Sequence, residues 1–145
     1  MNSALCLLVS GFLLLPVSVH ADDDARAAYK AAFSKFARQQ MSAQLVPVLV
    51  RNGVPEDQAK QKVAAFIDGS IECHMTSMDL NSARLTRPVY EVIENGGSYP
   101  DAKMEFELRL QKAVSEDDRE IVEPFQAGFE QGQACVAEIR QELGL

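Results

Sequence analysis

An apolar stripe with helical spacing runs through the C-terminal segment, and it constrains the fold more than any other feature of the chain. Its members follow one another at steps of three or four residues: Val122, Phe125, Phe129, Gly132, Val136, Ile139 and Leu143. This spacing places all of them on one face of an α-helix. We expect one long helix, interrupted only by Pro124, that begins at Ser115, which would form a capping box with Asp118, and ends at Gly144. Phe129, in the middle of the stripe, is predicted to be a central core residue.

Two earlier segments have the same periodicity. Over residues 23–46 the apolar positions are Tyr29, Ala32, Phe33, Phe36, Ala37 and Met41. We expect Pro47 to kink or interrupt this helix and Asn52-Gly53 to end the segment. A second helix should begin at Pro55. Its apolar stripe is Ala59, Val63, Phe66, Ile67, Ile71, Met75 and Met78.

The segment between these helices and the C-terminal one is less regular. A short helix is predicted over residues 82–94, broken or restarted at Pro88 and ended by Asn95-Gly96-Gly97. Over residues 102–112 apolar and polar side chains alternate, which is strand periodicity, but nearly every residue is a strong helix former. We expect helix. The predicted fold is therefore all-α, a compact bundle of four to five helices.

The N-terminal segment has the composition of a signal peptide. An apolar run extends from Ala4 to Leu15, Pro16 ends it, and Val19 and Ala21 are small residues before three aspartates. The run is shorter than the roughly 20 residues that span a bilayer, which disfavours an uncleaved anchor. We therefore predict a signal peptide at residues 1–21, a single helical domain at residues 22–145, and export to the periplasm or the medium.

Two cysteines, Cys73 and Cys135, remain in the predicted mature domain. An oxidising compartment permits a disulfide between them. Small residues surround both: Gly69 and Ser77 one turn either side of Cys73, and Gly132 and Ala134 beside Cys135. Small neighbours let two helices approach closely enough for the bond, so we predict that it staples the bundle.

The formal net charge of −7 restricts the partners that such a domain can have. It repels nucleic acid and anionic lipid surfaces, and it favours a cationic protein.

The sequence also disfavours an enzyme. His74 is the one histidine of the predicted mature domain, it adjoins a cysteine of the predicted disulfide, and the chain lacks recognisable nucleophile, phosphate-binding or metalloprotease motifs. We predict no catalytic residue, no cofactor and no metal ligand.

Elimination leaves binding of another macromolecule as the expected function, with an inhibitor or immunity-type partner of a basic protein as one candidate. Two alternatives remain. His74 and Met78 share a helix face beside Met75, a ligand set that suits Cu(I) in an exported protein. The other alternative is an enzyme of unrecognised type.

Overall fold

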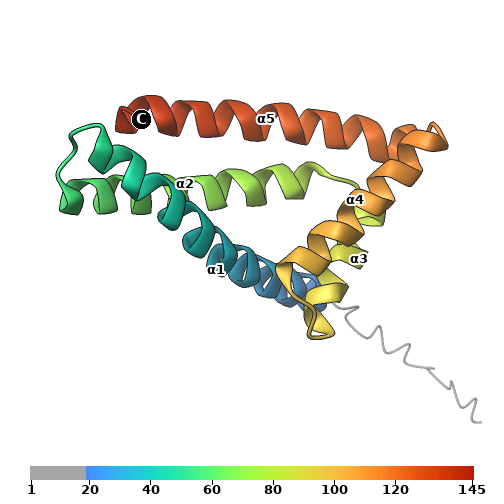
Figure 1. Cartoon of the computed structure of the whole chain (residues 1–145). Helices are drawn as coiled ribbons and strands as arrows, with labels where there is room; N and C mark the ends of the chain where they lie inside the picture. The colour runs from blue at the N-terminus through green and yellow to red at the C-terminus, as the bar shows by residue number, and fades with distance from the viewer. Residues whose placement is uncertain (1–18) are drawn as a thin grey trace, which may run out of the picture.

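Five helices make up the part of the chain that the computed structural model describes, residues 19–145 (Figure 1). They are α1 (Val19–Arg51), α2 (Glu56–Leu80), α3 (Ala83–Glu94), α4 (Tyr99–Ser115) and α5 (Arg119–Leu143). The described residues form no strand, so the predicted all-α fold and the helix over residues 102–112 are confirmed. The predicted signal peptide lies almost entirely outside the described residues. Within the described part, no helix is both long enough and apolar enough to cross a membrane.

The central element of the fold is α2. Helix α5 runs alongside it, α1 crosses it at an angle, and the hairpin of α3 and α4 connects the end of α2 to the beginning of α5 (Figure 1). Helix α1 diverges from α5, and its N-terminal half packs against α3 and α4. The helices therefore lie along three sides of an open arrangement and do not form stacked layers.

The buried core follows these contacts. One cluster lies between α1 and α2 and consists of Ala37, Val63, Ile67 and Ile71. A second, where α1, α2, α3 and α4 meet, consists of Tyr29, Met75, Met78, Val89 and Ala102. A third joins α3, α4 and α5 through Leu85, Ala113 and Ile121. The face of α2 predicted to be apolar is therefore the best-covered surface of the fold.

Of the two effects expected of Pro47, a kink or an interruption, the interruption is wrong, because α1 continues through it to Arg51. A proline inside a helix loses one backbone hydrogen bond and costs about 3 kcal/mol. Leu45, Val46 and Leu49, on either side of the proline, pack against the cluster between α1 and α2, and this burial offsets the cost. Pro88 and Pro124 likewise lie inside continuous helices. The predicted end at Asn52-Gly53 is confirmed, with Gly53 at a φ of 87°.

The predicted cap of the last helix at Ser115 is also wrong. Ser115 is the last residue of α4, and its hydroxyl donates to the carbonyl of Lys112. A short turn follows, in which Asp117 has a φ of 53°, and α5 begins after Asp118. The reciprocal capping box occurs instead at the start of α4, where Ser98 pairs with Asp101. Both segments read Ser-x-x-Asp, so the motif alone did not distinguish a helix start from a helix end.

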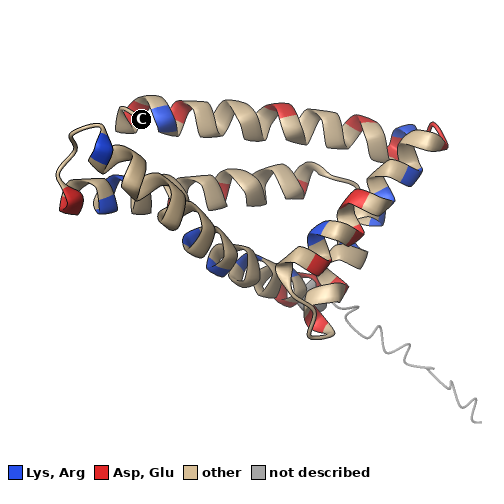
Figure 2. Ribbon diagram, viewed as in Figure 1, with Lys and Arg blue, Asp and Glu red and all other residues tan. Residues whose placement is uncertain are grey.

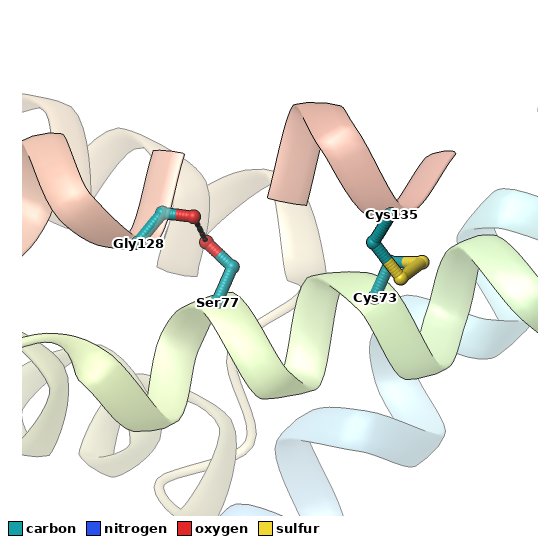
Figure 3. The surroundings of a disulfide bond; sticks show 4 residues. All are labelled: Cys73, Ser77, Gly128 and Cys135. Atoms are coloured by element: carbon teal, nitrogen blue, oxygen red, sulfur yellow. Dashed lines mark hydrogen bonds between the residues drawn. A yellow bond between two sulfur atoms is a disulfide. The ribbon is translucent and has the colours of Figure 1, made fainter. Parts of the chain in front are cut away.

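The disulfide forms as predicted and joins α2 to α5 (Figure 3). The S–S distance between Cys73 and Cys135 is 1.98 Å and their Cα atoms are 5.7 Å apart. One turn away, the Ser77 hydroxyl donates to the carbonyl of Gly128 at 2.7 Å (Figure 3). A methyl group on Gly128 would lie 2.8 Å from the backbone oxygen of Ser77, so this crossing needs a glycine.

The prediction for Phe129 is wrong, because 53% of its surface is exposed. The ridge of α5 that faces α2 is made of small or short positions, Gly128, Gly132 and Cys135, followed by Ile139 against Gly69. Phe129 is one residue further along, about 100° around the helix from Gly128, so it lies beside the contact. Ala134, predicted to border the crossing, is exposed for the same reason.

Candidate functional site

The gap beside the α2–α5 crossing is a groove lined by side chains from four helices. It comprises a cavity of about 650 Å³ between α1, α2 and α5 and one of about 370 Å³ bounded by α1, α2, α4 and α5. His74, Ser77 and Phe129 line both cavities, which therefore adjoin each other. We call the two together the α2 groove, the larger part its main section and the smaller part its aromatic end.

The main section is mostly apolar. Its lining consists of Phe33, Met41, Gln44 and Leu45 from α1, Phe66, Ser70, His74 and Ser77 from α2, and Phe129, Gly132, Gln133, Val136, Ala137 and Arg140 from α5. Arg140 is the sole Lys, Arg, Asp or Glu among these residues, although the chain has a net charge of −7. Its guanidinium lies 5.9 Å from the centre of the Phe66 ring. An apolar surface with few charges is suited to contact with another apolar surface.

The aromatic end is lined by rings from three helices. Tyr29, Tyr99, Phe106, Phe125 and Phe129 contribute to it together with His74. Phe125 lies 5.9 Å from Phe106 and 6.0 Å from Phe129 between ring centres. Two charged residues, Lys103 and Glu107, also line it, and they form an ion pair with each other at 2.7 Å.

His74 lies on the floor of the groove, where both parts meet. Its Nε2 is 2.9 Å from the hydroxyl of Tyr29, and its ring centre is 4.1 Å from that of Phe33. Burial lowers the pKa of His74 to about 4, so the imidazole is neutral at pH 7. Burial raises the pKa of Tyr29 far above its usual value, so this residue also stays neutral. The floor is therefore polar at His74, as it is at Ser70 and Ser77, without carrying charge.

The residues proposed for Cu(I) are only partly brought together. His74 and Met78 both line the aromatic end, but Met75 is 1% exposed and belongs to the core with Tyr29. One nitrogen of His74 is already engaged by Tyr29. Among the described residues no group of three His, Cys, Asp or Glu side chains is arranged to hold a metal ion.

Two buried polar atoms in the lining of the groove have no hydrogen-bond partner among the described residues. They are the hydroxyl Oγ of Ser70, in the main section, and the amide oxygen Oδ1 of Asn81, at the aromatic end. The amide nitrogen of Asn81 donates to the carbonyl of Ser77, which fixes the orientation of the side chain. An unpaired buried polar group costs about 1–3 kcal/mol.

All five helices carry charges of both signs, with the carboxylates of α1 confined to its beginning (Figure 2). Three ion pairs tie α1 to α2: Arg26–Asp79, Lys30–Glu72 and Arg38–Asp68, at 2.6, 2.6 and 2.7 Å. A cleft of about 380 Å³ near the start of α1 is lined by five carboxylates and two arginines, and two of those carboxylates are ion-paired with the arginines. The cleft therefore keeps a net negative charge, whereas the lining of the α2 groove is mainly apolar.

The sequence did not predict the groove. The one available signal is the width of the apolar face of α5, since Phe129, Val136 and Ala137 lie beside the ridge formed by Gly128, Gly132 and Cys135. A face wider than one helix contact needs a second neighbour or remains open. Comparison of the chain with known protein families, curated proteins and solved structures finds no match, so any assignment of function depends on the site itself.

Proposed function

We propose that this chain is an exported, non-catalytic protein that binds an apolar helical segment of a partner protein in the α2 groove. The observation that carries the proposal is the uncovered side of α5. Phe129 is half-exposed there, and with Val136 and Ala137 it forms an apolar wall opposite the mainly apolar wall of α1, above a floor on α2 that carries Phe66 and uncharged polar side chains.

The dimensions of the groove suit a helix. A helix with short side chains is about 10 Å wide and rises 5.4 Å per turn, which corresponds to roughly 400 Å³ per turn. The main section, at about 650 Å³, therefore accommodates between one and two turns. A floor made by one helix and walls made by two others is the arrangement in which an amphipathic helix places its apolar face in a groove.

The charge distribution supports a cationic partner. Arg140 is the one residue of the main section whose charge would repel a cation. The molecule as a whole is strongly acidic, with a net charge of −7, and would attract one. A partner with an apolar helix and a basic surface would bind through both the apolar groove and the acidic surface. Long-range attraction would raise the association rate, and apolar burial would set the lifetime of the complex. An inhibitor or immunity-type partner of a basic protein fits this description.

The state of the two chemically versatile side chains supports a non-catalytic role. His74 is neutral, largely buried and bonded to Tyr29, and Cys73 is held in the disulfide. Export is the remaining part of the proposal, supported by the composition of residues 1–21 and by the compatibility of a disulfide with an oxidising compartment.

The test uses a matched pair of substitutions on α5. Ala137→Glu places a carboxylate in the groove, and Ala127→Glu places the same group at an exposed position that does not line it. The mature domain, residues 22–145, would be used to capture partners from a periplasmic extract, with bound proteins identified by mass spectrometry. We expect one partner to be retained by the original chain and by Ala127→Glu, and lost by Ala137→Glu. Equal retention by both variants would contradict binding in the groove.

A further inference from the structure

We propose that Arg140, in the main section of the α2 groove, forms an ion pair with a carboxylate on the apolar face of the partner helix. This inference rests on the proposed function and deepens it by naming a charged residue that the partner carries and the place where it binds. Three properties of Arg140 support it: the lack of a counter-ion, the exposed position of its guanidinium over an aromatic ring, and the apolar lining around it.

Arg140 forms no ion pair within the described part of the chain, although the sequence has 21 carboxylates for 14 lysines and arginines. Six other cationic side chains pair with a carboxylate four residues away in their own helix. Such a pair is impossible for Arg140, because the residues three and four positions away are Val136, Ala137, Leu143 and Gly144. Its guanidinium therefore remains available to an anion from another molecule.

An aromatic ring positions this guanidinium at the groove. Its Cζ atom lies 5.9 Å from the centre of the Phe66 ring, which is buried and lines the main section. Arg140 itself is exposed, so a ligand can reach its N–H donors. The planar guanidinium matches the two oxygens of a carboxylate, and a side chain that already rests on a ring loses less freedom when it binds.

The apolar lining makes the pairing selective. Arg140 is the one charged residue of the main section, so a partner helix that covered it with an apolar side chain would remove a charge from water without compensation. A lysine or arginine of the partner would be repelled there, whereas an aspartate or glutamate completes an ion pair. A basic surface elsewhere on the partner is compatible with this carboxylate, because long-range attraction depends on the summed charge.

The position of Arg140 along α5 predicts a spacing in the partner. Arg140 follows Phe129 by 11 residues, which corresponds to about 16 Å or three helical turns. A partner helix that lies along α5 therefore carries its acidic residue about three turns from the side chain that meets Phe129.

The experiment compares two peptide probes that differ at one position. Each is an amphipathic helix of about 18 residues with leucines on one face and lysines on the other, and one end of the leucine face carries either a glutamate or a glutamine. Calorimetric titration into the mature domain should show about two- to fivefold tighter binding of the glutamate peptide. General attraction to an acidic protein predicts the opposite order, because the glutamate lowers the positive charge of the peptide. Equal affinities would overturn the inference alone, and no binding of either peptide would contradict the groove as well.

Variants localise the effect. Arg140→Gln removes the guanidinium from an exposed position and should abolish the preference for the glutamate peptide. Arg119→Gln removes the same charge from an exposed position of α5 that does not line the groove, and it should keep the preference. A preference that persists in Arg140→Gln, with helicity unchanged by circular dichroism, would contradict Arg140 as the site. Because these titrations need no partner protein, their outcome is independent of the Ala137→Glu capture experiment.

Discussion

Helices α2 and α5 are alike in length, each with 25 residues, and are joined by one disulfide, but they differ in how much of their apolar face is covered. Eight residues of α2 are buried: Ala59, Val63, Phe66, Ile67, Ile71, Cys73, Met75 and Met78. In α5 only Ile121 and Gly128 are buried. The more regular stripe in the sequence thus belongs to the less buried helix.

The difference arises from the number of neighbours. Helix α2 packs against both α1 and α5, whereas α5 packs against α2 along its length and against α4 near its beginning. Periodicity identifies the face that is apolar, but the tertiary arrangement determines how much of that face another helix covers. The uncovered part of α5 is the wall of the α2 groove.

The disulfide should make the largest contribution to holding α5 on α2. It closes a loop of 62 residues, which corresponds to about 4 kcal/mol in the chain-entropy treatment. We expect the reduced protein to lose about that much unfolding free energy in denaturant titrations followed by circular dichroism. A Cys73→Ala/Cys135→Ala variant, which should not respond to reductant, is the control. A loss below about 1 kcal/mol would mean that packing alone holds α5 in place.

Truncating one apolar residue in each helix should cost different amounts of unfolding free energy in α2 and α5. Ile67→Ala removes a 1%-exposed side chain of α2 and should cost roughly 2–5 kcal/mol through lost burial and a cavity. Phe129→Ala on α5 should cost less than about 1 kcal/mol, because the ring is already half in water. The denaturant midpoint of each variant measures its loss, provided that the slope of unfolding free energy against denaturant concentration is unchanged. Similar losses for the two variants would contradict the comparison between α2 and α5.

Lowering the pH should reduce the stability of the fold through His74, which lies where the covered face of α2 meets the groove. The folded pKa of His74 is about 4 and its ordinary value is 6.5, so the unfolded chain takes up a proton first as the pH falls. The stabilisation is complete above about pH 6.5 and is lost as the pH falls toward 4, by up to about 3 kcal/mol. His74→Gln should flatten this part of the stability profile. An unchanged profile in that variant would mean that His74 is not the titrating group.

Replacing a glycine at the α2–α5 contact by alanine should cost an amount of stability that depends on the atom that the new methyl group meets. Gly128→Ala brings a methyl group within 2.8 Å of a backbone oxygen, and we expect a cost of about 1–3 kcal/mol. Gly69→Ala meets the terminal carbon of Ile139 at 2.6 Å, and that flexible side chain can move aside at a smaller cost. Thermal unfolding of both variants checks the order. A larger loss for Gly69→Ala would indicate that Ile139 is fixed in position.

The smallest effect is expected for copper. Titration of the mature domain with Cu(I) against a competing chelator should show no competition at micromolar protein, because one nitrogen of His74 is bonded to Tyr29 and Met75 is in the core. A stoichiometric site that disappears in His74→Ala/Met78→Ala, with helicity retained, would establish metal binding and displace the proposal of a partner-binding groove.

Much of the fold could be predicted from residue patterns. The helical face of α2, the end of α1 at Asn52-Gly53 and the pairing of Cys73 with Cys135 all followed from spacing and side-chain size. Local rules failed where packing offsets a local cost or where a motif is ambiguous. Pro47 lies inside α1 because its apolar neighbours pack against the core, and Ser115 ends a helix although its sequence resembles a helix start.

The sequence by itself determined that this protein is helical, acidic and joined across its length by one disulfide, because these properties depend on local periodicity, charge and the count of cysteines. Only the tertiary structure decided which apolar side chains are core and which line the groove. Phe125 and Phe129 share the stripe of α5 with Ile139, yet they reach the aromatic end because Gly128 and Gly132 bring the neighbouring ridge against Ser77. The physical reason is that burial depends on how helices distant in sequence are placed, and the apolar spacing is the same whether or not a neighbour covers it.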